Sequence, residues 1–225
     1  MNRLANDEGS PLKLVIGNKN YSSWSLRPWI LMQHSGIEFD EIRIPLFTTE
    51  GEKLLEKWCP AKQVPVLHDG PLVLWDSLAI CEYIADKNPH RALMPDESSD
   101  RAKARAMSAE MHSGFGALRT FMPMNCRRII EGFEPDLNTR IDINRIVQLL
   151  EQALDESGGP WLFGRYSVAD AMFAPVASRF HTYGIKAPGN TRSYFEQVLA
   201  DPAMQTWYRA AVDENEVIEK SEVIL

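Results

Sequence analysis

This chain of 225 residues has 44% hydrophobic and 24% charged side chains, the composition of a globular protein. Its net charge of −7 argues against a nucleic-acid-binding surface as its main purpose. No apolar run approaches the roughly 18 residues that span a bilayer, and residues 1–10 lack the apolar stretch of a secretory signal. We therefore expect a cytoplasmic protein that binds neither nucleic acid nor a membrane.

The first part of the chain alternates strand-like and helix-like patterns. In order, these are a strand at 12–17, a helix at 25–35, a strand at 39–46, a short helix at 50–57, two strands within 64–76 and a helix at 77–87. The first two strands need a crossover helix and are expected to be parallel, whereas the last two form a hairpin. The order β-α-β-α-β-β-α predicts an α/β layer with helices on the faces of a sheet.

Beyond residue 88 the sequence is helical in pattern. One long helix is expected from residue 101 to 122, bent or continued around Pro123, with further helices at 137–157, 166–184, 194–202 and 203–215. Residues 89–99 are polar and contain prolines, which indicates a linker. We divide the chain into a disordered tail at 1–11, an α/β domain at 12–88, the linker at 89–99 and an all-helical domain at 100–225.

Residues 21–28, with the sequence YSSWSLRP, offer three serine hydroxyls ahead of a predicted helix. Pro28 lacks an N–H group and is tolerated in the first turn of a helix, so we expect the helix cap at Ser25 or beyond. Ser22 and Ser23 then lie in the loop that faces the helix N-terminus, where free N–H groups and the helix dipole favour an anion. The alternative is that both serines only solvate a turn.

Two further segments place polar groups in the same layer. A cis bond between Val64 and Pro65 would expose the backbone of Val64 for pairing with an extended peptide, whereas an ordinary trans proline would not. Asp76 and Ser77 precede an apolar helix, where they either cap it or hold a carboxylate. Because open sheets place ligands near such ends, the segments together with residues 21–28 describe a site for a small anionic peptide.

The helical part carries polar residues that favour structural roles. Ser167 and Asp170 have the spacing of a capping box at the start of a core helix. Methionine and aromatic residues within 111–125 indicate core packing, but His112 and two glycines interrupt that stripe, so one face is expected to border a cavity. His112 itself fits a structural histidine better than a general base. The three cysteines form no CxxC pair and are expected to be inert core thiols, which disfavours dithiol exchange.

Several of these segments together resemble the soluble glutathione S-transferase family, over nearly the whole chain from Leu12 onward. The matching segments are SSWSLRPW at 22–29, KQVPVLHDG at 62–70, WDSLAICEYI at 75–84, LMP at 93–95 and GRYSVADAMFAP at 164–175. The first of them most resembles the zeta class, whose pattern is Ser-Ser-Cys before Ser-x-Arg, with Trp24 in place of the cysteine. The resemblance implies a thioredoxin-like N-terminal α/β domain followed by an all-helical bundle domain.

The resemblance also implies roles for individual residues toward glutathione. The residue that activates the thiol is expected to be Ser22 first, Ser23 second and Tyr21 third. The family pattern implies a cis bond at Pro65, and the residues implied to hold glutathione are Ser22, Lys53, Gln63, Val64, Pro65, Asp76 and Ser77. Those implied to contact the second substrate are Tyr21, Trp24, Met111, Phe115, Arg119 and Met122. No metal is required.

The activity implied is that of a glutathione S-transferase, which adds the glutathione thiolate to a small hydrophobic or electrophilic substrate. One alternative is a glutathione-dependent isomerase of the maleylacetoacetate type, against which Trp24 and Pro28 count because they replace the cysteine and valine of that class. A second alternative is a transferase-like scaffold that binds a partner without turnover. Family members are usually homodimers, and we expect a homodimer here.

Overall fold

A four-stranded mixed sheet forms the centre of the first domain. The structure, a computed structural model, describes residues 11–222. Of the tail predicted at 1–11, residues 1–10 therefore lie outside the described residues. The strands are β1 (Lys13–Ile16), β2 (Asp40–Arg43), β3 (Val66–Asp69) and β4 (Leu72–Leu74), in the spatial order β2-β1-β3-β4. β1 and β2 are parallel and the other two pairs are antiparallel, which confirms the predicted crossover and hairpin.

The alternation of side chains along β1 divides the core of this domain between the two faces of the sheet. Successive strand residues point to opposite faces. Leu14 and Ile16 therefore join the large hydrophobic core, whereas Val15 packs with Val66 and the apolar side of α2 in a second, smaller cluster. Both faces are covered, as an α/β layer requires.

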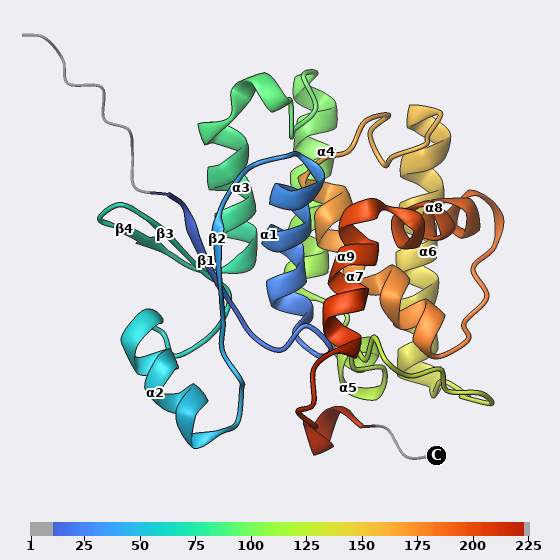
Figure 1. Cartoon of the computed structure of the whole chain (residues 1–225). Helices are drawn as coiled ribbons and strands as arrows, with labels where there is room; N and C mark the ends of the chain where they lie inside the picture. Colours follow the sequence, from blue (N-terminus) through green and yellow to red (C-terminus); the bar gives the residue numbers. More distant parts are fainter. Residues whose placement is uncertain (1–10, 223–225) are drawn as a thin grey trace, which may run out of the picture.

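Three helices complete the first domain in the predicted β-α-β-α-β-β-α order. They are α1 (Ser23–His34), α2 (Thr49–Trp58) and α3 (Ser77–Lys87). In Figure 1, α2 lies on one side of the sheet, while α1 and α3 lie on the other side, toward the helical part of the chain. The arrangement is the expected thioredoxin-like domain, followed by an all-helical domain.

The second domain contains six α-helices within the described residues. They are α4 (Ser98–Ser113), α5 (Gly116–Phe121), α6 (Leu137–Ser157), α7 (Val168–Thr182), α8 (Gly189–Ala200) and α9 (Pro202–Val212). The expectation of one long helix over 101–122 is wrong. The helix ends at Ser113 because Gly114 adopts an extended backbone and Phe115 the left-handed conformation, with φ 60°. A short helix then follows as a separate element.

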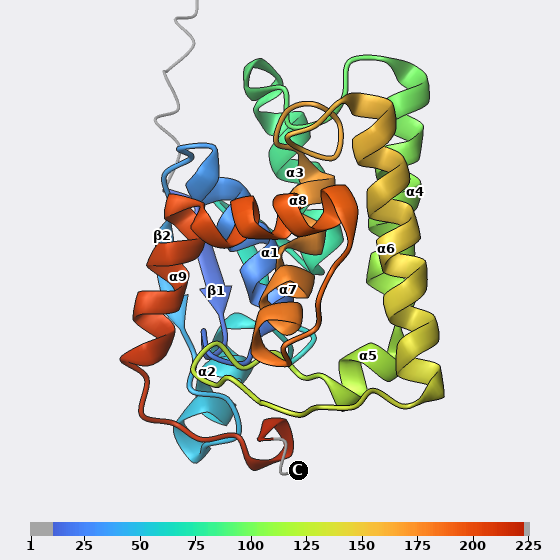
Figure 2. The same ribbon diagram turned by 90° about the vertical axis from the view of Figure 1, so that its right-hand side faces the viewer.

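Helix α7 lies in the middle of the second domain and packs against α1 of the first. All but one of its residues, the exception being His181, are buried. Asp170 accepts hydrogen bonds from the backbone N–H and the hydroxyl of Ser167, at 2.8 and 2.9 Å, which confirms the predicted capping box. In Figure 2, α4 and α6 run side by side at the outer side of this domain.

The chain after α9 returns to the first domain and braces the loop that follows β1. The carboxylate of Glu214 accepts hydrogen bonds from the backbone N–H groups of Lys19 and Asn20, at 2.7 and 3.1 Å. Figure 2 shows this segment passing below the sheet. Glu216 adds an ion pair with Arg43 at 2.7 Å. The loop is thus held from the C-terminal side as well as by α1.

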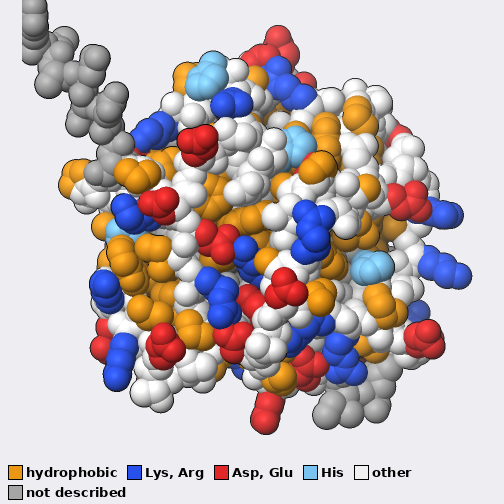
Figure 3. All heavy atoms as spheres, in the orientation of Figure 1, with side chains coloured by type: hydrophobic (Ala, Val, Ile, Leu, Met, Phe, Trp, Pro, Cys, Tyr) orange, Lys and Arg blue, Asp and Glu red, His pale blue; other side chains and the backbone are white. Residues whose placement is uncertain are grey.

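Within residues 11–222, no helix is long and apolar enough to cross a bilayer. On the face seen in Figure 3, basic and acidic side chains are interspersed and form no stripe of one sign.

Candidate active site

Packing brings together the three segments that were singled out in the sequence. A Cβ atom on Gly17, just after β1, would lie 2.5 Å from Leu46 Cδ1 and 3.2 Å from the side chain of Val64, so the loop after β1 packs closely against the segment before β3. At the other end of the loop, the ring of Trp24 contacts that of His112 edge to face, with centroids 5.3 Å apart. His112 Nε2 lies 3.0 Å from Asp76 Oδ2. The loop after β1, the segment before β3 and the start of α3 therefore border one region.

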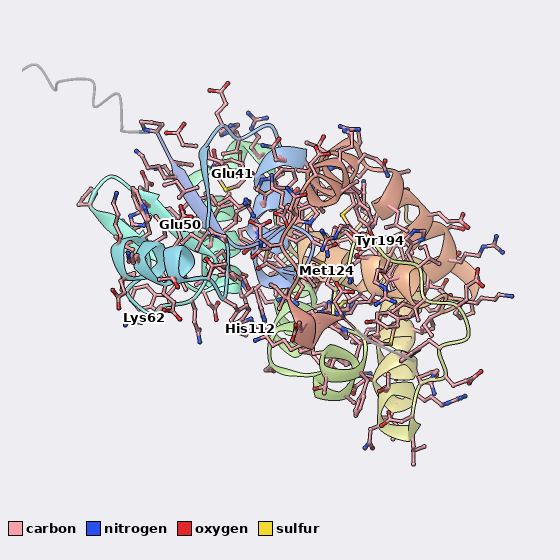
Figure 4. The ribbon with its side chains drawn as sticks, turned by 60° about the horizontal axis from the view of Figure 1, so that its bottom comes forward. Glu41, Glu50, Lys62, His112, Met124 and Tyr194 are labelled. Carbon is pink, nitrogen blue, oxygen red and sulfur yellow. The ribbon has the colours of Figure 1, made fainter. Side chains whose placement is uncertain are left out.

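This region lies at the boundary of the two domains. Figure 4 places His112, from α4, between the α/β domain and the helical domain. In the same view Glu50 and Lys62 lie on the side of α2, away from the second domain. A ligand at the start of α1 would therefore contact both domains.

The N-cap of α1 is Ser22, which corrects the expectation that the cap is at Ser25 or beyond. The Ser22 side chain accepts from the backbone N–H of Ser25 at 3.4 Å and donates to the Ser25 hydroxyl at 2.7 Å. Ser25 in turn accepts from the backbone N–H of Gly17 at 3.1 Å. Pro28 is the sixth residue of α1, so the carbonyl of Trp24, four residues earlier, loses the hydrogen bond that an N–H at position 28 would have donated. Ser22 is thus engaged in the cap.

Ser23, the first residue of α1, has a different environment. Its hydroxyl oxygen accepts a hydrogen bond from Nη2 of Arg179 on α7, at 3.1 Å. The side chain is buried, and Arg179 itself is only 3% exposed. A residue of the second domain therefore reaches the start of α1, where helix N–H groups and the dipole favour an anion.

The hydroxyl of Tyr21 is engaged with the C-terminal segment. It donates to Glu222 Oε1 at 2.6 Å and accepts from Arg127 Nη2 at 2.8 Å. Burial, together with the hydrogen bond to Glu222, raises the pKa of Tyr21 above its usual value. These two hydrogen bonds and the raised pKa make Tyr21 a poorer candidate than the two serines for activating a thiol.

The start of α3 and the segment before β3 have the expected local structure. The Val64–Pro65 bond is cis, as the family resemblance implies. Asp76 caps α3 by accepting from the backbone N–H groups of Leu78 and Ala79, at 3.1 and 3.4 Å. The buried hydroxyl of Ser77 has no hydrogen-bond partner among the described residues. An unpaired buried donor is costly, so this hydroxyl is available to a ligand oxygen.

Two arginines enclose the ring of Trp24. The guanidinium carbon of Arg27 lies 4.2 Å from the ring centroid and that of Arg119 lies 4.6 Å from it. Arg27 is completely buried, and both of its terminal nitrogens lack a hydrogen-bond partner within residues 11–222. Burial, followed by the charges of Arg119 and Arg179, lowers the pKa of Arg27 well below its usual value. The boundary of the domains therefore holds three arginines, none of which forms an ion pair with a described residue.

Comparison with known proteins agrees with this arrangement. The family model for the N-terminal domain of glutathione S-transferases matches residues 21–87, and the model for the C-terminal domain matches residues 138–210. The maleylacetoacetate isomerase of Dictyostelium discoideum is 32% identical over 192 residues, which cover 80% of this chain and 86% of that protein. This chain belongs to the glutathione S-transferase family.

Other members of the glutathione S-transferase family show the same relationship. The maleylacetoacetate isomerase of Rattus norvegicus is 27% identical over 203 residues, covering 83% of this chain and 88% of that protein. Among solved structures, a glutathione transferase from Methylococcus capsulatus is similar with a TM-score of 0.66 and 27% identity, covering 89% and 98% of the two chains. A Burkholderia glutathione transferase homologue, solved with bound glutathione, shares the fold with a TM-score of 0.70 at 22% identity, covering 91% and 100%.

The remaining residues expected from the family differ in their placement. Lys53, on α2, and Gln63 are both exposed. Met111, Phe115 and Met122 are buried in the large core, and Met111 and Met122 are completely inaccessible. The backbone carbonyl of Met111 accepts from Arg119, and that of Met122 accepts from Arg179. Of the residues expected beside the second substrate, Trp24 and Arg119 are the partly exposed ones that the structure brings to the start of α1.

Sequence reasoning missed two of the charged residues at the site. Arg27 is the arginine of the Ser-x-Arg pattern in the SSWSLRPW segment, but its burial could not be inferred from the sequence because arginines are mostly exposed. Arg179 lies 156 positions from Ser23 in the chain, and only the packing of α7 against α1 brings them together. The sequence favours a structural role for His112, and its contact with Asp76 makes it a neighbour of the site.

Proposed function

We propose that this protein binds glutathione at the start of α1, stabilises its thiolate and adds it to a small electrophile. The observation that carries this proposal is the pair of hydroxyls at the α1 N-terminus beside three buried or half-buried arginines without an ionic partner among the described residues. A buried cation without a counter-ion is costly. An anion bound there, such as a thiolate, offsets part of that cost.

The residues present fit the rest of the glutathione molecule. Asp76 and the unpartnered hydroxyl of Ser77 would hold the γ-glutamyl end, since they supply a carboxylate for its ammonium and a donor for its carboxylate. The backbone of Val64, next to the cis bond to Pro65, would pair with the cysteinyl unit. The exposed Gln63 or Lys53 would contact the glycyl carboxylate.

The chemistry depends on ionisation of the thiol. A free thiol has a pKa near 8.5, so a decrease of about two units, worth roughly 2.7 kcal/mol, makes it mostly ionised at neutral pH. Bound glutathione supplies the nucleophile: with an aryl halide, a carbon–sulfur bond forms, the carbon–halogen bond breaks, the halide leaves with the electron pair, and the thiol proton passes to water. The serine hydroxyl donates a hydrogen bond and the α1 N-terminus supplies positive potential.

The electrophile would lie against Trp24 and Arg119. A favoured second candidate function is glutathione-dependent isomerisation, because relatives of this chain are named maleylacetoacetate isomerases. Trp24 stands where that class carries cysteine, which is the reason to place transfer before isomerisation. The third candidate, a scaffold without turnover, is separated from these two by the activity test below.

The first test is glutathione binding by calorimetry, followed by turnover of a generic aryl halide. The variant that removes the acting hydroxyl, Ser22→Ala or Ser23→Ala, is expected to reduce turnover much more than it weakens binding, because that hydroxyl acts on the thiolate. Absence of glutathione binding, together with capture of a partner protein, would favour the scaffold. A substrate screen that includes maleylacetoacetate and small peroxides then separates transferase, isomerase and peroxidase activity.

We also propose, from family resemblance, that the protein is a homodimer in which the α/β domain of one copy contacts the helical domain of the other. Light scattering after size-exclusion chromatography measures the mass directly. A mass of about one chain at micromolar concentration contradicts this proposal.

A further inference from the structure

Arg179 is a buried cation whose recorded hydrogen bonds all go to neutral acceptors. Its Nε donates to the backbone carbonyl of Met122 at 2.8 Å, Nη1 donates to that of Pro175 at 3.4 Å, and Nη2 donates to the hydroxyl of Ser23 at 3.1 Å. No carboxylate within residues 11–222 forms an ion pair with it. Burying a charge in this way costs several kcal/mol unless another charge offsets it. The position of Arg179 therefore needs an explanation beyond packing.

The bond from Arg179 decides what the Ser23 hydroxyl is able to do. A guanidinium only donates, so the Ser23 oxygen is the acceptor and its own hydrogen points elsewhere. The Ser22 hydroxyl, in contrast, donates to Ser25 and accepts from the Ser25 backbone. Ser23 is thus the serine of the pair whose O–H is not used in its contacts with the described residues, so it is available to donate to a ligand.

The charges around Arg179 leave this region positive. Burial, and then the charge of Arg119, lowers the pKa of Arg179 to about 9, while Tyr183 and Cys126 act in the opposite direction. Arg27 also lies within electrostatic range of Arg179, and its own environment includes Asp76 and Cys81. The charge of Arg119 thus destabilises both Arg27 and Arg179, that of Arg179 also destabilises Arg27, and Asp142 acts in the opposite direction on Arg119. An anion bound beside Arg27 and Arg179 is therefore stabilised by both.

Building on the proposed function, we propose that Arg179 is a positioning residue for thiol activation: it orients the Ser23 hydroxyl as the donor to the glutathione sulfur, and its charge stabilises the thiolate. The activating unit therefore spans both domains, with the hydroxyl on α1 and the cation that orients it on α7. Ser23, rather than Ser22, is the hydroxyl that acts on the sulfur. Ser22 supports the same site by capping the helix.

The experiment measures the ionisation of bound glutathione directly. Saturated complexes of the wild type, Arg179→Gln and Ser23→Ala are titrated with pH while the ultraviolet absorbance of the thiolate is followed. The midpoint is expected to rise by about one pH unit in each variant, a tenfold loss of thiolate near neutral pH. The double variant is expected to rise by less than the sum of the two shifts, because the residues act as one unit. Ser22→Ala is expected to shift the midpoint less than Ser23→Ala does.

A titration midpoint does not depend on how much of a variant is folded, and two further controls separate positioning from structure. S-methylglutathione has no ionisable thiol, so its affinity for Arg179→Gln is expected to remain within about twofold of wild type. Asp170→Ala weakens the same helix through its capping box and is expected to leave the midpoint unchanged. Arg179→Lys keeps the charge but loses the planar fork, so its titration midpoint is expected to lie between those of wild type and Arg179→Gln.

The outcomes distinguish the two levels of the proposal. A wild-type midpoint near that of free glutathione, or no binding, overturns the proposed function and this inference with it. A lowered wild-type midpoint that is the same in Arg179→Gln overturns only the role of Arg179. A larger shift in Ser22→Ala than in Ser23→Ala overturns the assignment of the acting hydroxyl. A shift in Asp170→Ala equal to that in Arg179→Gln shows that Arg179 acts only through the stability of α7.

Discussion

His112 on α4 and Asp76 at the start of α3 form an ion-pair contact across the domain boundary, with Nε2 and Oδ2 3.0 Å apart. The other oxygen of Asp76 caps α3 by accepting from the backbone N–H of Leu78 at 3.1 Å. One carboxylate thus contributes to three things: the helix start, the contact between domains and the region proposed to hold the γ-glutamyl group.

The first prediction separates these roles of Asp76. Because the contact is partly exposed, His112→Ala is expected to lower the free energy of unfolding by no more than about 1 kcal/mol. Asp76→Ala is expected to cost about 1 kcal/mol more, since it also removes the cap. Glutathione affinity, measured by calorimetry, is expected to fall at least tenfold in Asp76→Ala and only a few-fold in His112→Ala. Equal losses of affinity would show that Asp76 acts through its partner.

The second prediction concerns the buried carboxyl of Asp170. Burial raises its pKa to about 6. The folded state therefore binds the proton more tightly than the unfolded state, and the contribution of Asp170 to the free energy of unfolding falls as pH rises from about 4 through 6. The size is about 3 kcal/mol for a shift of two units. Urea unfolding of wild type and Asp170→Asn between pH 4 and 8 is expected to show this slope only in wild type; parallel curves contradict it.

The third prediction follows from the cap of α1. Ser22→Ala is expected to lower the free energy of unfolding by about 1 kcal/mol, whereas Ser22→Gly costs only a few tenths, because glycine is tolerated at an N-cap. Chemical denaturation measures both. A loss in Ser22→Gly as large as that in Ser22→Ala would mean that the hydroxyl network with Ser25, rather than the cap, is what the first domain requires.

The fourth prediction is that the thiols are unreactive in the native protein. The three cysteines are free and buried, and burial raises the pKa of Cys59 to about 11, that of Cys126 to about 12, and that of Cys81 as well. Since the thiolate is the reactive form, none is expected to react with Ellman's reagent near neutral pH within minutes. All three are expected to react once the chain is unfolded in urea. Fast reaction of one thiol in the native protein would indicate local opening.

The fifth prediction uses Trp24 as a reporter. Its ring lies between Arg27 and Arg119 at the start of α1, and it is partly exposed. Glutathione is expected to quench its fluorescence, and Trp24→Phe is expected to lose most of the quenching while keeping a ring between the arginines. Trp58, on the α2 side of the sheet, gives a matched control. Glutathione is expected to quench the fluorescence of Trp58→Phe as strongly as that of wild type. Quenching retained in Trp24→Phe would place the ligand elsewhere.

Local patterns were sufficient to predict most elements of the fold. The helix at 77–87 and that at 137–157 agree with α3 and α6, because a cap and a steady helical spacing mark both their ends. The prediction of one long helix over 101–122 was wrong because its two glycines, taken as a break in the core stripe, flank the point where Phe115 turns the chain. The predicted cap of α1 was wrong because the helix accommodates Pro28 at its sixth position, although proline is expected only in the first turn.

The sequence by itself determined the family, the order of the elements and the polar residues 22, 23, 76 and 77, because these depend on short-range spacing along the chain. It also placed the serines at a helix N-terminus, but it left Ser22 and Ser23 equivalent except by resemblance. Only the tertiary structure distinguished them. Packing of α7 against α1 brings Arg179 to Ser23, although the two residues are 156 positions apart in the chain. Local patterns do not predict this contact, because burial and long-range contacts arise only when the domains pack.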